Sequence, residues 1–146
     1  MGFVIILISF YIQTGTISDT AMLISIPISI LVGAILLANN IRDIVGDKEN
    51  GRKTVAILLG RKNAIFLLAA MFIVSYALIV LFIALGYASF WLLLVFLSVA
   101  KPLSAIKGFT NNNSNVTMMP AMVATAKTNT IFGFLLGIGL VIGYFA

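Results

Sequence analysis

The sequence contains no cysteine and no histidine, and only 9% of its 146 residues are charged. Without cysteine the chain has no disulfide bond, no thiolate metal ligand and no thiol nucleophile. Without histidine it has no imidazole general base, no histidine-bound zinc and no Ser-His catalytic pair. Any chemistry that the chain performs therefore depends on carboxylates, amides, lysine, arginine or a bound cofactor.

Hydrophobic residues make up 62% of the chain. A soluble domain of this size cannot bury so much apolar surface, and soluble domains are typically about 25% charged. We therefore expect one integral membrane domain over residues 1–146, built as an all-α bundle of transmembrane helices. The net charge of +5 is expected to orient the chain in the membrane rather than to bind nucleic acid.

Uncharged apolar stretches predict four full spans. The stretch 64–100 is too long for one crossing, because about 20 residues suffice, and it divides naturally at Gly86. The four predicted spans are residues 21–38, 64–85, 87–106 and 128–146. Residues 1–12 are apolar but too short to cross, so we interpret them as part of a helix, which adds a partial first helix to the bundle.

The basic residues predict the orientation. They fall in residues 42–62 and at Lys101, Lys107 and Lys127, which flank the loop before the last span. The intervening connections contain none. Under the positive-inside rule, the basic connections face the cytoplasm. We therefore expect a multi-pass cell-membrane protein whose loop 39–62 is cytoplasmic.

The most informative segment is 39–62, which reads NNIRDIVGDKENGRKTVAILLGRK. If the second span continues as a helix, Leu36, Asn40, Asp43 and Asp47 share one face. Two carboxylates four residues apart on a helix repel each other unless a cation lies between them. Mg²⁺ commonly takes one or two carboxylates and completes its shell with water and phosphate oxygens. Asp43 and Asp47 are therefore candidate metal ligands.

The cations that follow the acids extend this hypothesis. Lys48, Arg52 and Lys53 could hold a diphosphate. Gly46 and Gly51 allow a helix break and a close approach of the backbone to an anion. The spacing by itself equally suits a solvated loop that only fixes orientation. Asparagines at 39 and 40, directly after the apolar span, favour the metal-site interpretation because polar groups are costly there.

The whole segment resembles the second aspartate-rich motif of the UbiA superfamily of intramembrane prenyltransferases. It is most similar to that motif in the 1,4-dihydroxy-2-naphthoate polyprenyltransferases of menaquinone synthesis. Residues 119–133, MPAMVATAKTNTIFG, also resemble the segment that leads into the last helix of that family. The resemblance covers essentially the whole chain but only the C-terminal half of a family member.

The resemblance implies a helical bundle around a central cavity that opens to lipid. Two aspartate motifs there hold Mg²⁺ on a polyprenyl diphosphate. Ionisation leaves an allylic carbocation, which alkylates the aromatic ring, and 1,4-dihydroxy-2-naphthoate also loses its carboxyl group as CO₂. The expected function is therefore Mg²⁺-dependent transfer of a polyprenyl group to that acceptor.

The resemblance also assigns residues by their motif positions, without naming a catalytic residue. Asp43 and Asp47 match the metal-binding acids. The leading polar positions are matched by Asn39, Asn40 and Arg42. Candidates for the diphosphate are Lys48, Arg52 and Lys53. Weaker candidates, explained equally well by contact with lipid phosphates, are Arg61, Lys62 and Lys127.

One departure leaves open whether this chain is itself an enzyme. The first motif of the family, an NDxxDxxxD string, is absent, and the remaining acids are Asp19 and Glu49. The chain then offers half a metal site, so we expect a truncated or split form, with a separate N-terminal half as a candidate partner.

Two other function classes stay open. One is a non-catalytic membrane remnant or partner protein, which packs through glycines of the last span: Gly133, Gly137, Gly139 and Gly143. The other, less favoured, is a transporter fragment. The string GDKENGRK resembles a cytoplasmic loop of major-facilitator transporters, but its gap from Asp47 to Gly51 is one residue too long.

Overall fold

The computed structural model describes residues 2–146, and every regular element in that range is helical. Four segments are long and apolar enough to cross a membrane, namely α2 (Asp19–Arg42), α5 (Arg61–Ala84), Phe90–Asn111 and α7 (Met119–Phe145). The short helices are α1 (Gly2–Thr14), α3 (Ile44–Glu49) and α4 (Val55–Leu59). This confirms the all-α fold with four spans and a short apolar first helix. Met1, the first residue of that predicted partial helix, lies outside the described residues.

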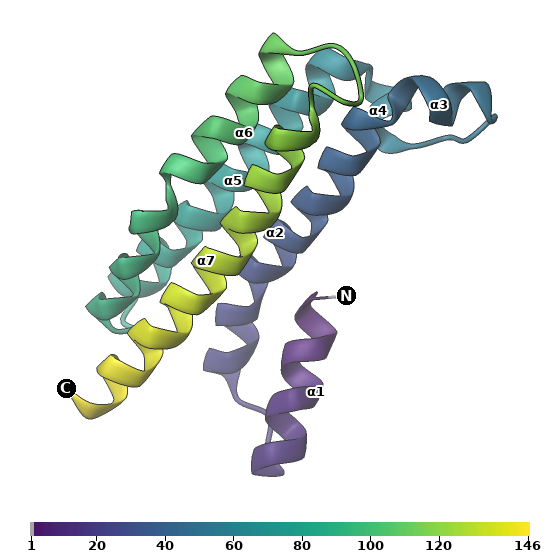
Figure 1. Cartoon of the computed structure of the whole chain (residues 1–146). Helices are drawn as coiled ribbons and strands as arrows, with labels where there is room; N and C mark the ends of the chain where they lie inside the picture. The colour runs from purple at the N-terminus through teal and green to yellow at the C-terminus, as the bar shows by residue number, and fades with distance from the viewer. Residues whose placement is uncertain (1) are drawn as a thin grey trace.

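The four long segments form one bundle (Figure 1). The segment Phe90–Asn111 consists of a 3₁₀ helix, η1 (Phe90–Ser98), followed by α6 (Ala100–Asn111). Helix α2 packs on α5 and α7, and α7 packs on η1 and α6. Helix α1 lies against α2, while α3 and α4 follow the end of α2, and α4 packs on α2 and α5 (Figure 1).

Apolar side chains both fill the bundle and cover it. Leu31, Leu68, Phe109 and Phe132 are completely or almost completely buried between the helices. Large apolar side chains such as Phe66 are exposed on the outside. Helices that are apolar on every side are typical of proteins whose surroundings are hydrocarbon. The long helices therefore have apolar outer surfaces that suit a bilayer.

Some polar groups inside the bundle are hydrogen-bonded across helices, whereas Thr125 and Thr128 bond to carbonyl oxygens of their own helix. Pro27 lies in the middle of α2, and the Ser75 hydroxyl of α5 donates to its carbonyl oxygen at 3.3 Å. The hydroxyls of Tyr76 in α5 and Ser98 in η1 lie 2.5 Å apart. Such bonds satisfy polar groups that have no water partner in a bilayer.

Two glycines of α7 allow η1 and its N-cap residue, Ser89, to approach closely. A Cβ on Gly139 would lie 2.7 Å from the carbonyl oxygen of Trp91, and one on Gly143 would lie 2.6 Å from the Ser89 Cβ. A Cβ on Gly133 or on Gly137 would have no neighbouring atom within 4 Å among the described residues. The sequence suggested that Gly139 and Gly143 could pack against a partner protein. Within the described residues, they pack instead against η1 and Ser89 of this chain.

The helix boundaries differ most from the predicted ones around the loop between α6 and α7. Gly86, with φ +77°, ends α5 as expected. However, α7 begins at Met119 rather than at residue 128, and α6 continues to Asn111. All three lysines that were predicted to flank the loop therefore lie within helices. The charge pattern misplaced these ends because a lysine stem can lie along apolar surface while its ammonium reaches polar surroundings.

Candidate metal and diphosphate site

The predicted motif begins in the last turn of α2. Asn39 and Asn40 are half-buried there, and α2 ends at Arg42. Asp43 leaves helical geometry, with φ −95° and ψ 10°, and its N–H donates to the Asn39 carbonyl oxygen at 2.9 Å. Helix α3 starts at the next residue and runs in a different direction (Figure 1).

The break at Asp43 changes the predicted shared face. The Asp47 N–H still donates to the Asp43 carbonyl oxygen at 2.8 Å, which preserves their spacing. The face of α2, however, does not continue into α3, because Leu36 is 63% exposed whereas Asp47 is 8% exposed. The break lies at Asp43 rather than at either glycine of the motif. Gly46 is inside α3, and Gly51 forms the following turn with φ +69°.

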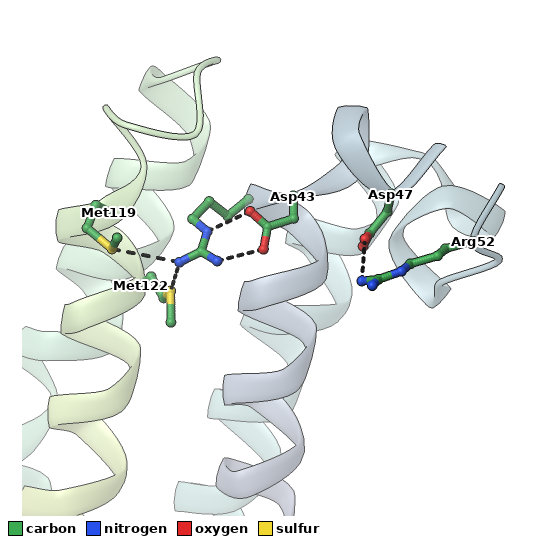
Figure 2. A network of polar contacts seen from close by, with 6 residues as sticks. Asp43, Asp47, Arg52, Met119 and Met122 are labelled. Atoms are coloured by element: carbon green, nitrogen blue, oxygen red, sulfur yellow. Dashed lines mark hydrogen bonds and ion pairs between the residues drawn. The ribbon is translucent and has the colours of Figure 1, made fainter. Parts of the chain in front are cut away.

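Asp43 is held by the residue before it. The Nε and Nη2 atoms of Arg42 donate to its two carboxylate oxygens at 2.8 and 2.6 Å (Figure 2). These hydrogen bonds lower the pKa of Asp43, partial burial opposes them, and the charges of Arg42 and Arg52 add to the lowering. The remaining Arg42 nitrogen contacts the sulfur atoms of Met119 and Met122 in α7. Arg42 thus links the aspartate motif to the start of α7.

Asp47 has a different arginine. Arg52 Nη1 lies 3.1 Å from Asp47 Oδ1 (Figure 2). The backbone N–H of Arg52 also donates to the Asp47 carbonyl oxygen at 2.9 Å. The carboxylate side chain is 11% exposed, but the Arg52 side chain is 72% exposed. A buried acid is therefore covered by a cation that faces outward.

The other predicted cations are distributed more widely. Lys48, Lys53 and Lys62 are exposed at the same end of the bundle as the acids. Arg61 instead donates to the carbonyl oxygens of Phe109 and Asn112, at the end of α6. Lys127 lies on α7, in a pocket shared with α6. The structure therefore gathers the acids with Arg42 and Arg52, and it places Arg61 and Lys127 in other surroundings.

The chemistry of the two motif acids suits Mg²⁺, but the described residues do not form a complete metal site. Within residues 2–146 no three acidic side chains gather at one point that could hold a metal ion. Asp43 and Asp47 nevertheless offer hard carboxylate oxygens, and each is neutralised by an arginine. Mg²⁺ that used these acids would complete its shell with water and phosphate oxygens.

Sequence reasoning named Arg42 without its partner, and it did not name Thr54. Arg42 was matched only as a leading polar position, although its adjacency to Asp43 was the signal of an ion pair. Thr54, the N-cap of α4, has a buried hydroxyl oxygen without a hydrogen-bond partner among the described residues. It follows Lys53 directly in the GRKT string.

Comparison with known proteins decides the family. The model of the UbiA prenyltransferase family matches residues 1–118. The chain belongs to the UbiA prenyltransferase family. No solved structure matches the chain significantly.

Similar UbiA-family proteins occur in bacteria and animals. The chain is 59% identical, over 99% of its length, to the 1,4-dihydroxy-2-naphthoate octaprenyltransferase of Bacillus subtilis, and 27% identical to the Escherichia coli protein of that name. Both alignments cover 47% of the relative's length. A UbiA prenyltransferase domain-containing protein 1 homolog of Drosophila melanogaster is 36% identical over 92% of this chain and 36% of its own length. The chain thus spans about half the length of the two bacterial relatives and a smaller share of the Drosophila relative.

Proposed function

We propose that this chain supplies the second half of a Mg²⁺-dependent site that transfers a polyprenyl group from its diphosphate to 1,4-dihydroxy-2-naphthoate. The observation that carries the proposal is the pair Asp43 and Asp47, each held by an arginine at one end of α2. The name of the Bacillus subtilis relative supports the choice of acceptor. The other half of the site, with the acids of the NDxxDxxxD motif, would come from a separate N-terminal half.

The ion pairs define how the residues act. Asp43 and Asp47 would hold the metal ion, and the exposed Arg52 side chain, now paired with Asp47, would bind a diphosphate oxygen. Lys48 and Lys53, also exposed, bind the remaining diphosphate charge. When bound, Mg²⁺ would supply charge neutralisation of the diphosphate as a leaving group.

The transfer breaks the bond between the allylic carbon and the diphosphate oxygen and forms a bond from that carbon to the naphthoate ring. The electron pair of the broken bond leaves with the diphosphate, and the ring carbon releases its carboxyl group as CO₂. By the positive-inside rule, this site faces the cytoplasm.

The test is binding of a polyprenyl diphosphate to the chain in detergent micelles, with and without Mg²⁺. We expect Mg²⁺-dependent binding that is lost in Asp43→Asn and Asp47→Asn. Asp19→Asn is the matched control, because Asp19 is the same residue type at the other end of α2. Equal binding by all three variants would refute the assigned roles.

Catalysis is tested separately. We expect prenylated product only when the chain is co-expressed with a segment that carries an NDxxDxxxD motif. Product without that segment would overturn the half-site assignment. Binding that is independent of Mg²⁺, with no product in either case, would favour a non-catalytic membrane protein.

A further inference from the structure

A pocket of about 500 Å³ lies between α6 and α7, outside the aspartate motif. Its polar lining comes from Lys101 and Ser104 of α6 and Lys127 of α7. Its apolar lining consists of Val116, Met119, Pro120, Val123 and Ala124. Two cations from different helices therefore share one pocket with a hydroxyl and an apolar wall.

The charge of this pocket is uncompensated. Both lysines are exposed, and no acidic residue lines the pocket. The side-chain ion pairs of the described residues involve Arg42 and Arg52 and neither of these lysines. The pocket thus presents two positive charges to whatever enters it.

The helix N-terminus adds to this positive potential. Helix α7 starts at Met119, and its N-cap residue Met118 makes no side-chain hydrogen bond to it; the Met119 N–H donates to the Val116 carbonyl oxygen at 3.2 Å, and Pro120 has no N–H. The start of a helix carries a partial positive charge, and residues of this first turn line the pocket. Lysines, hydroxyl and helix end all favour an anion.

The position along the helices indicates where the anion comes from. Lys127 lies about 12 Å along α7 from its start, and Lys101 lies about 15 Å from the end of α6, at 1.5 Å per residue. Both lie in segments long and apolar enough to cross a membrane. A charged group at that depth is costly unless it has a partner, and lysine stems reach toward lipid phosphates.

We propose that Lys101 and Lys127 bind the phosphate of an anionic membrane phospholipid. Ser104 donates to a phosphate oxygen, and Val123 and its apolar neighbours contact the first carbons of the acyl chain. The site is distinct from the diphosphate site, because neither motif acid and neither of their arginines lines the pocket; Met119 adjoins both, since it contacts Arg42 and also lines the pocket. Lys127 then serves a lipid rather than the prenyl substrate.

The test is native mass spectrometry of the whole chain, released from micelles that contain phosphatidylglycerol and phosphatidylcholine. We expect one retained phosphatidylglycerol and no selective retention of phosphatidylcholine. Each of Lys101→Ala and Lys127→Ala lowers the affinity about fivefold, since one lysine near an anionic surface contributes about 1 kcal/mol. Arginine at either position preserves binding.

The matched control is Lys107→Ala, because Lys107 is an exposed lysine of α6 that lies outside this pocket. An equal loss in this control would overturn the proposal in favour of diffuse charge attraction. Displacement of the lipid by free pyrophosphate would overturn the choice of a phospholipid. Circular dichroism of each variant verifies that its helices are intact, and lipid retention by the double alanine variant also contradicts the proposal.

Discussion

Arg61, the first residue of α5, donates a hydrogen bond of 2.8 Å to the backbone carbonyl oxygen of Phe109 near the end of α6. It donates a second to the carbonyl oxygen of Asn112 and contacts the sulfur of Met118. The last carbonyl groups of a helix have no intrahelical partner and carry a partial negative charge. One guanidinium therefore joins the start of α5, the end of α6 and the loop that leads to α7.

This relationship predicts that Arg61 contributes to stability. Arg61→Ala should lower the free energy of unfolding by about 1.5–3 kcal/mol, the range for hydrogen bonds made by a charged group. The measurement is denaturation in mixed micelles followed by circular dichroism. Lys62→Ala is the matched control, because Lys62 is the next residue and is exposed. Similar losses in both variants would contradict the role given to Arg61.

The ion pair at Asp43 predicts a pH dependence. Because Arg42 lowers the pKa of Asp43 in the folded state, the stability that this pair contributes is present above about pH 4, the ordinary range of the carboxyl. It is lost as the pH falls through the lower, folded-state pKa. Carbon-13 NMR of the aspartate carboxyls measures the titration in micelles.

Substitutions around Asp43 sharpen this prediction. Arg42→Met should raise the pKa of Asp43 toward its ordinary value, because it removes the hydrogen bonds that dominate the shift. Arg52→Met should raise it less, since Arg52 acts only through its charge. A larger effect from Arg52→Met would reverse the assigned order of causes.

The glycines of α7 predict opposite effects on two faces of one helix. Gly139→Ala should destabilise the bundle by about 1–3 kcal/mol, because the new Cβ would overlap the backbone of η1. Gly137→Ala should be neutral or stabilise by up to about 1 kcal/mol, since nothing lies within 4 Å and alanine favours helix. Unfolding of both variants in the same micelles compares them, and equal destabilisation would contradict the packing.

Much of the architecture could be predicted from local patterns. Uninterrupted apolar runs predicted the four spans, and Gly86 predicted the turn after α5. The spacing of polar residues in 39–62 also predicted a candidate metal and diphosphate site, and the roles of those residues stay a prediction. Such patterns can be recognised in a sequence because a helix that crosses a bilayer must be long and apolar, and because turns with positive φ favour glycine.

The details of the site could not be predicted in this way. Nothing in the sequence indicated that the helix would break at Asp43, that Arg61 would join the end of α6, or that Lys101 and Lys127 would share a pocket. Each depends on residues brought together from separate helices or on a change of backbone direction.

The sequence by itself determined the helical class, the number of spans and the family, because composition, periodicity and a contiguous motif are local properties. Only the tertiary structure decided which partner each charged side chain has. Arg42 and Arg52 neutralise the two acids, while Lys101 and Lys127 lie together without an acid in their pocket. Hydrogen bonds and ion pairs act over a few ångströms, so partners are set by how the helices pack rather than by distance along the chain.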